Sequence, residues 1–213
     1  ILTDGETRYG QRAVGTITPA LTAHRDPALQ PLAHDPARAR ALLAEAGWTD
    51  SDGDGIVDRD GTALRFTLLT NASNPRRAQA QLIVVDQLRD VGVDARAESV
   101  AGGPLFNRML EGDFEAVLYG WGAGLFVDPS DMWRTGGGYN ITGYNDPETD
   151  ALIDTGLAQR DPAAQAETWR QLQARIYDAQ PYCFLYWRDD LVAIDGRFQD
   201  VGTDIVSSLT DLH

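Results

Sequence analysis

The sequence predicts an α/β fold in which helices cover both faces of a mostly parallel sheet. Between residues 64 and 121, three segments with the composition of strands alternate with two amphipathic segments. Connections between parallel strands of one sheet are almost always right-handed, so this order predicts parallel strands with helices packed against them. The 213 residues are enough for one well-packed core.

The sequence before residue 64 predicts a lead-in segment and one helix. Residues 1–30 contain frequent Gly and Pro and little periodicity, so we expect an extended segment that belongs with a lobe of the protein that this chain does not contain. A helix is predicted to begin at Asp35-Pro36, where the aspartate caps it and the proline fits its first turn, and to end at Gly47.

The alternating unit itself is expected as a strand at 64–69, a long helix after Pro75, a strand at 93–99, a helix at 105–110 and a strand at 115–121. Two further helices, which open at Asp146-Pro147 and Asp161-Pro162, are expected to pack on this sheet. The sequence therefore predicts a lobe over 31–189, after the lead-in at 1–30 and before an irregular tail at 190–213.

The end of the lobe predicts a closing pair of strands at 182–187 and 191–194. Cys183 is the sole cysteine of the chain, and its apolar neighbours indicate a buried core residue rather than a reactive thiol. A single cysteine also excludes an internal disulfide and a thiolate metal cluster.

Charge and composition exclude two classes of protein. The net charge is −14, and Arg76-Arg77 is the longest basic run, so we expect no nucleic-acid partner. No apolar run approaches the roughly 20 residues that a membrane-spanning helix needs.

Catalytic motifs are also missing from the sequence. The three histidines, His24, His34 and His213, lie in predicted loops or ends, and none is next to a plausible nucleophile. No Gly-rich loop carries the lysine that a phosphate site needs. We therefore predict no catalytic residue, no cofactor and no enzyme; a hydrolase that uses two of the 32 acidic residues is the alternative from the enzyme class.

An acidic segment at 50–61 contains the sharpest local motif. Asp50, Asp52 and Asp54 alternate before a glycine, as in a calcium-binding loop. The twelfth position, however, is Gly61 instead of a bidentate glutamate, and a strand is expected next instead of a second helix. We interpret the segment as a tight acidic turn and predict no metal site; the alternative is a calcium-dependent structural module.

The segment that follows the third strand is the candidate ligand site. Ligands gather at the carboxyl ends of strands in open parallel sheets, and here an aromatic residue and a loop of small residues lie at that end. Both tryptophans of the segment could instead close the end of the core. The candidate ligand-binding residues are Trp121, Gly122, Ala123, Gly124, Asp128, Trp133 and Arg134.

The order of motifs along the chain resembles the family 5 extracellular solute-binding proteins, which are the receptors of dipeptide, oligopeptide, nickel and some oligosaccharide importers. The resemblance covers the whole length of the chain. The segments that carry it are 35–48, 52–61, 112–115 leading to Gly120-Trp121, Asn140, 144–153 and 181–186.

The resemblance implies a two-lobed fold like that of periplasmic binding proteins, with this chain as the C-terminal lobe. It further implies a monomeric, non-catalytic receptor in the periplasm or outside the cell, lipid-anchored or secreted. Such a receptor closes its N-terminal lobe and this lobe around a peptide or small polar solute, which it delivers to an ABC permease in the membrane.

One position departs from the pattern of the family. Peptide-binding members place an aspartate three residues after the tryptophan that ends the strand, where it pairs with the amino terminus of the ligand, and that position here is Gly124. Asp128 or Asp131 of the same loop could replace this anchor. A sugar stacked on Trp121 is the alternative ligand.

Overall fold

The computed structural model describes residues 9–122, 127–189, 193–195 and 197. Contacts divide the chain into two compact units. The first, here called the sheet unit, comprises residues 33–121. The second, here called the helical unit, combines residues 1–32 with residues 122–213.

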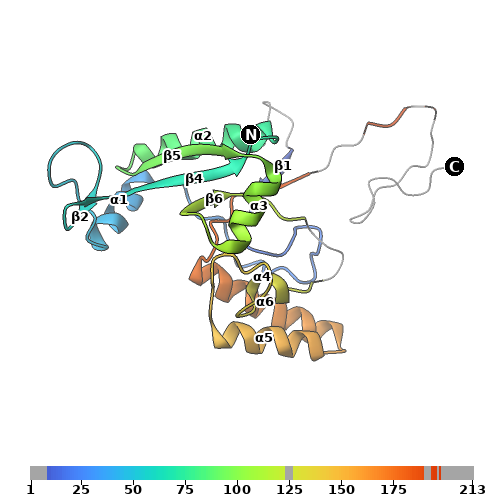
Figure 1. Ribbon diagram of the computed structural model, residues 1–213. Coiled ribbons are helices and arrows are strands. Elements are labelled where there is room, and N and C mark those ends of the chain that lie inside the picture. The colour runs from blue at the N-terminus through green and yellow to red at the C-terminus, as the bar shows by residue number, and fades with distance from the viewer. Residues whose placement is uncertain (1–8, 123–126, 190–192, 196, 198–213) are drawn as a thin grey trace. The chain divides into compact units, whose positions relative to one another are not determined.

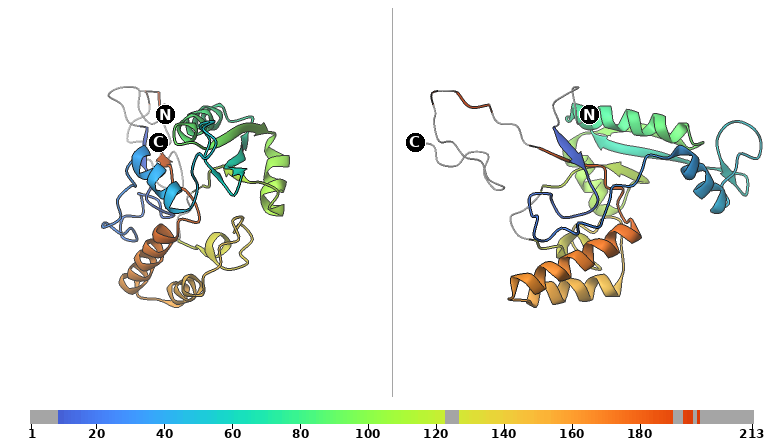
Figure 2. Two further views of the ribbon diagram at one scale, coloured as in Figure 1. Left: turned by 90° about the vertical axis from the view of Figure 1, so that its left-hand side faces the viewer. Right: turned by 180° about the vertical axis from the view of Figure 1, so that it is seen from behind.

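The sheet unit contains the predicted alternation of strands and helices (Figure 1). Its elements are α1 (Pro36–Glu45), β2 (Asp58–Arg59), β3 (Thr62–Ala63), β4 (Arg65–Asn71), α2 (Pro75–Arg89), β5 (Asp94–Val100), α3 (Gly102–Glu111) and β6 (Ala116–Leu118). Strands β4, β5 and β6 form a parallel sheet in the order β5-β4-β6, while β2 and β3 form a separate antiparallel hairpin. Figures 1 and 2 show the sheet between α2 and α3, so the predicted α/β fold is confirmed.

The central strand β4 is buried on both faces. Leu68, Leu69 and Thr70 are consecutive and all buried, and consecutive side chains of a strand point to opposite faces. Gln81 of α2 is also buried, and its side-chain amide donates to the carbonyl of Leu68 on β4 and, at 3.0 Å, to the carbonyl of Glu98 on β5. These hydrogen bonds attach α2 to two neighbouring strands and satisfy a polar group that would be costly to bury alone.

The helical unit contains β1 (Gly10–Arg12), α4 (Ser130–Trp133), α5 (Pro147–Ala158), α6 (Pro162–Ala179) and β7 (Tyr186–Arg188). Helices α5 and α6 lie side by side in Figures 1 and 2. Its core is a cluster of buried apolar residues that come from the lead-in, α4, α5 and α6, namely Ile17, Trp133, Ile153, Trp169, Leu172 and Ile176.

Three expectations from the sequence are corrected in this unit. Helices α5 and α6 belong to the helical unit and pack on each other, whereas the sequence led us to expect them in one unit with the sheet. Of the predicted strand at 182–187, only residues 186–187 belong to a strand, β7, which pairs with β1. Of the predicted strand at 191–194, residues 191–192 lie outside the described residues and 193–194 are not a strand. Cys183 is exposed and not in the core, although partial burial of its thiol raises the pKa.

A charged network connects α5 to α6. The Asp146 carboxylate caps α5 and accepts hydrogen bonds from the backbone N–H of Thr149 at 3.3 Å and from its hydroxyl at 2.7 Å. Arg175 of α6 donates to both carboxylate oxygens. The guanidinium holds the pKa of Asp146 well below its usual range. This pair fixes the start of α5 against α6.

Candidate functional site

The carboxyl end of the parallel sheet carries a guanidinium and an aromatic side chain in contact. Asn74 caps α2, and its side chain accepts from the backbone N–H of Arg77 at 3.0 Å. The Arg77 guanidinium carbon lies 4.6 Å from the ring centroid of Tyr119, and its Nη2 donates to the carbonyl of Gly120 at 3.3 Å. The first turn of α2 is thereby attached to the segment that leaves β6.

Trp121 is a second contact of Tyr119. It is half-buried, and its ring meets the Tyr119 ring edge-on at a centroid distance of 5.4 Å. Arg77, Tyr119 and Trp121, here called the strand-end group, are therefore connected by contacts through Tyr119, at the end of the sheet where ligands of open α/β folds bind. Sequence reasoning predicted Trp121 and missed the other two. The signal for Arg77 would have been its place in the first turn of the helix that follows the central strand.

The remaining predicted site residues differ in what surrounds them. Gly122 is exposed, whereas Ala123 and Gly124 lie outside the described residues. Asp128 is exposed, and its Oδ1 accepts from the backbone N–H of Ser130 at 3.0 Å, as in a turn that precedes a helix.

Trp133 is a core residue. Its exposed fraction is 1%, its indole nitrogen donates to the Thr16 hydroxyl at 2.8 Å, and its ring centroid lies 4.8 Å from that of Tyr182. Of the two roles that the sequence allows for this tryptophan, the structure supports closing the core. A side chain without exposed surface cannot contact a solute.

Arg134 is engaged in an ion pair with Asp154 of α5, which raises the pKa of its guanidinium. The backbone N–H of its neighbour Thr135 donates to the Asp150 carboxylate at 2.8 Å. These bonds attach the end of α4 to α5, so the arginine has a structural partner within its own unit.

The acidic segment forms a turn held by its own backbone. Carboxylate oxygens of Asp50, Asp52 and Asp58 lie within 4.8 Å of one another. However, Asp50 accepts from the backbone N–H groups of Gly53 and Gly55, at 2.7 and 3.0 Å. Hydrogen bonds from Ser51 lower the pKa of Asp58. Both glycines have positive φ, 82° and 88°, as the predicted turn requires.

We expect calcium to bind this segment weakly or not at all, because the Asp50 oxygens already accept backbone N–H groups and the bidentate ligand is missing at Gly61. Calorimetric titration of the chain with CaCl₂ measures this, with Asp52→Asn as the matched variant. A dissociation constant below about 10 μM that rises in the variant would show that the turn is an ion site.

The hydrolase alternative requires two acidic residues that face each other across a cavity. A cavity of about 620 Å³ has Asp26 as its only acidic lining residue. A cavity of about 360 Å³ is lined by Asp50 and Asp90, but the oxygens of Asp50 accept hydrogen bonds from its own turn. A glycosidase needs two carboxyl groups that are both free to act on the substrate.

Comparison with known proteins identifies related chains. Residues 3–143 match the family described as bacterial extracellular solute-binding proteins, family 5 Middle. The oligopeptide-binding protein AppA of Bacillus subtilis is 33% identical over an alignment of 162 residues, and the match covers 74% of this chain and 30% of the relative. The structure of AppA in complex with a nonapeptide superposes with a TM-score of 0.80 at 30% identity, covering 84% of this chain and 37% of AppA.

A second solved structure extends the range of ligands among the relatives. NikA from Brucella suis, in complex with Fe(III)-EDTA, superposes with a TM-score of 0.72 at 25% identity over 84% of this chain and 37% of NikA. No helix among the described residues is long and apolar enough to cross a membrane. By the coverages given above, the chain spans about a third of the length of AppA and of NikA. It belongs to the family of bacterial extracellular solute-binding proteins, family 5.

Proposed function

We propose that the chain is the C-terminal lobe of a monomeric, non-catalytic receptor that binds a peptide or another small polar solute and delivers it to an ABC permease. Membership of the family and the similarity to AppA support this function. The receptor would act in the periplasm or outside the cell, lipid-anchored or secreted. The proposed lobe comprises 31–189 together with the part of the lead-in that packs in the helical unit, which includes β1 and Ile17. An N-terminal lobe outside this chain is its proposed partner.

The observation that carries the proposal is the strand-end group. Trp121 is half-buried, so part of its surface is accessible to a ligand; its ring contacts Tyr119, which in turn contacts Arg77. Solute receptors enclose ligands with rigid aromatic side chains and a few oriented polar groups. The proposed contact residues are Trp121, Gly122, Ala123, Gly124 and Asp128; Trp133 and Arg134 are left out because of their structural roles.

A carbohydrate is the second candidate ligand. Gly124 stands where peptide receptors of the family place their acidic anchor, and a desolvated ammonium without a carboxylate is costly. Two adjacent aromatic rings, Tyr119 and Trp121, suit the apolar face of a sugar ring equally well.

The substitution Trp121→Ala in the longer receptor is expected to weaken binding of its copurifying solute by about tenfold to 100-fold, as truncation of a central aromatic contact does. Mass spectrometry of the purified receptor identifies the solute and separates peptide from carbohydrate, and calorimetry measures the affinity. Trp48→Ala is the matched control, because Trp48 is also half-buried in the sheet unit but stacks under Arg59, 4.5 Å from its guanidinium carbon. Unchanged affinity for Trp121→Ala would remove the strand-end group from the binding site.

A further inference from the structure

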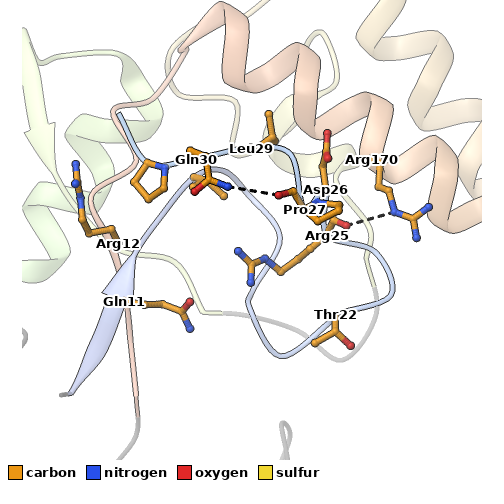
Figure 3. Close-up of a pocket in the computed structure, with 11 residues that line it drawn as sticks. Gln11, Arg12, Thr22, Arg25, Asp26, Pro27, Leu29, Gln30 and Arg170 are labelled. Carbon is orange, nitrogen blue, oxygen red and sulfur yellow. Dashed lines mark hydrogen bonds between the residues drawn. The ribbon is translucent and has the colours of Figure 1, made fainter. Parts of the chain in front are cut away.

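The largest cavity described above lies in the helical unit, between β1 and the loop at 22–31, and shares no residue with the strand-end group. Figure 3 shows the side chains around it. Its volume of about 620 Å³ is within the range of small-molecule sites, roughly 300–1,000 Å³. It is lined by Gln11, Arg12, Val14, Thr22, Arg25, Asp26, Pro27, Leu29, Gln30, Pro31 and Arg170.

Arg170 builds the wall of the cavity. Its guanidinium donates to the carbonyl of Arg25 at 3.3 Å (Figure 3) and to that of Ala23 at 2.7 Å. It also forms an ion pair with Glu167 at 3.0 Å, so its charge is compensated. Arg170 therefore fixes the loop on α6 and is not available to a ligand.

Asp26 and Arg12 are partly engaged as well. Asp26 Oδ1 accepts from the backbone N–H of Ala28 at 2.9 Å, so the carboxylate is turned to its own loop. Arg12 donates through Nη2 to the carbonyl of Leu32 and forms no ion pair within the described part of the chain. Its remaining N–H groups stay available at the edge of the cavity.

Arg25 is the charged lining residue whose side chain has no partner among the described residues. It is half-buried, and its guanidinium makes neither a hydrogen bond nor an ion pair with any residue that the structure describes. Figure 3 shows its side chain extending from the loop into the space beside β1. The chain has 32 acidic residues, yet none of the described ones compensates this arginine. Partial desolvation makes an unpaired charge costly, and an anion in the cavity would remove this cost.

We propose that this cavity binds a carboxylate group, with Arg25 as its main partner and Arg12 as a second donor. With Arg170 compensated, the lining carries the positive charges of Arg12 and Arg25 and the negative charge of Asp26, a balance that fits a monoanion. The planar fork of a guanidinium matches the two oxygens of a carboxylate. Val14, Pro27, Leu29 and Pro31 supply an apolar wall for an aliphatic chain.

The carboxylate could come from a free organic acid or from a side chain of the longer receptor outside this chain. The probe for both sources is hexanoate, with hexanamide as its uncharged counterpart. We expect hexanoate to bind the 213-residue chain with a dissociation constant on the order of 1 mM and hexanamide to bind more weakly by roughly tenfold, the value of a charge-assisted hydrogen bond.

The substitution Arg25→Ala is expected to weaken hexanoate binding by roughly tenfold or more. It should not lower the melting temperature and could raise it, because the side chain has no partner in the described structure and its partly desolvated charge is costly. Arg160→Ala, which removes an exposed arginine of the same unit outside the cavity, should leave binding unchanged. Chemical-shift changes of the backbone amide NMR signals of Gln11 and Thr22 on addition of hexanoate would locate the site independently of affinity.

The same titration on the longer receptor distinguishes the two sources. Equal binding there supports a free organic acid, and loss of binding there supports a carboxylate supplied by the receptor itself. No saturable binding of hexanoate to the chain, or binding that Arg25→Ala leaves unchanged, would overturn the proposal. None of these outcomes depends on Trp121, so the proposed transport function can fail or stand separately.

Discussion

The 213-residue chain is expected to bind the solute of the longer receptor about 1,000-fold more weakly than that receptor does, a difference on the order of 4 kcal/mol. This result follows if the chain supplies one wall of the binding site. A ligand that rests on the strand-end group alone would keep much of its surface in water and lose roughly half of its contacts. It would still lose translational and rotational freedom on binding, so most of the favourable free energy would be cancelled.

Parallel titrations of the chain and the longer receptor test this, with tryptophan fluorescence as the readout. Trp121 is expected to carry the signal, since Trp133 is 1% exposed and has no surface for a solute. Trp121→Phe in both proteins identifies the source of the signal. Equal affinity of the two proteins would mean that this chain contains a complete site of its own.

The substitution Gly156→Ala is expected to destabilise the chain by a net amount of about 2 kcal/mol. Gly156 lies on the face of α5 that packs on α6, where an added Cβ would lie 2.4, 2.6 and 2.7 Å from three ring atoms of Trp169. Trp169 is 1% exposed and packed within the core of the helical unit, so the ring has little room to move. Overpacking costs about 3 kcal/mol at its upper range, against a gain of about 1 kcal/mol from the helix propensity of alanine.

Denaturant unfolding followed by circular dichroism measures this loss. Gly103→Ala is the matched control, because Gly103 is also in a helix and no heavy atom lies within 4 Å of its added Cβ. In the double variant Gly156→Ala/Trp169→Leu, the smaller side chain should accept the methyl group. The losses of unfolding free energy in the single variants Gly156→Ala and Trp169→Leu should then sum to more than the loss in the double variant. Strict additivity of the two losses would contradict the clash.

The sheet unit could be predicted because its signals are local. Asp35 accepts from the backbone N–H of Arg38 as an N-cap, and the apolar run of β4 is the buried central strand. The same kind of signal located helices α5 and α6, but it did not predict which element packs against their apolar faces. Periodicity shows that a face is apolar and contains no information on whether a sheet or another helix packs against it.

The candidate site was predicted only in part for a related reason. Trp121 and Trp133 have equivalent sequence signals, yet one is half-buried at the end of the sheet and the other lies in the core. The contribution of Arg77 depends on its contact with Tyr119, which is 42 positions away in the chain and becomes a neighbour only when β4 pairs with β6. Such contacts follow from topology and have no local signature.

The division of the chain into units has a consequence for the order of folding during synthesis. The sheet unit is one continuous segment, so every residue of its parallel sheet has been synthesised once residue 121 is in place. The helical unit cannot be completed so early, because Ile17 packs in one cluster with Ile176 and Gly10 pairs with Arg188. Its first strand must wait for nearly the whole chain, with the sheet unit as the intervening loop. A sheet unit that folds first shortens the distance that this loop must span and lowers the entropy cost of closing the helical unit.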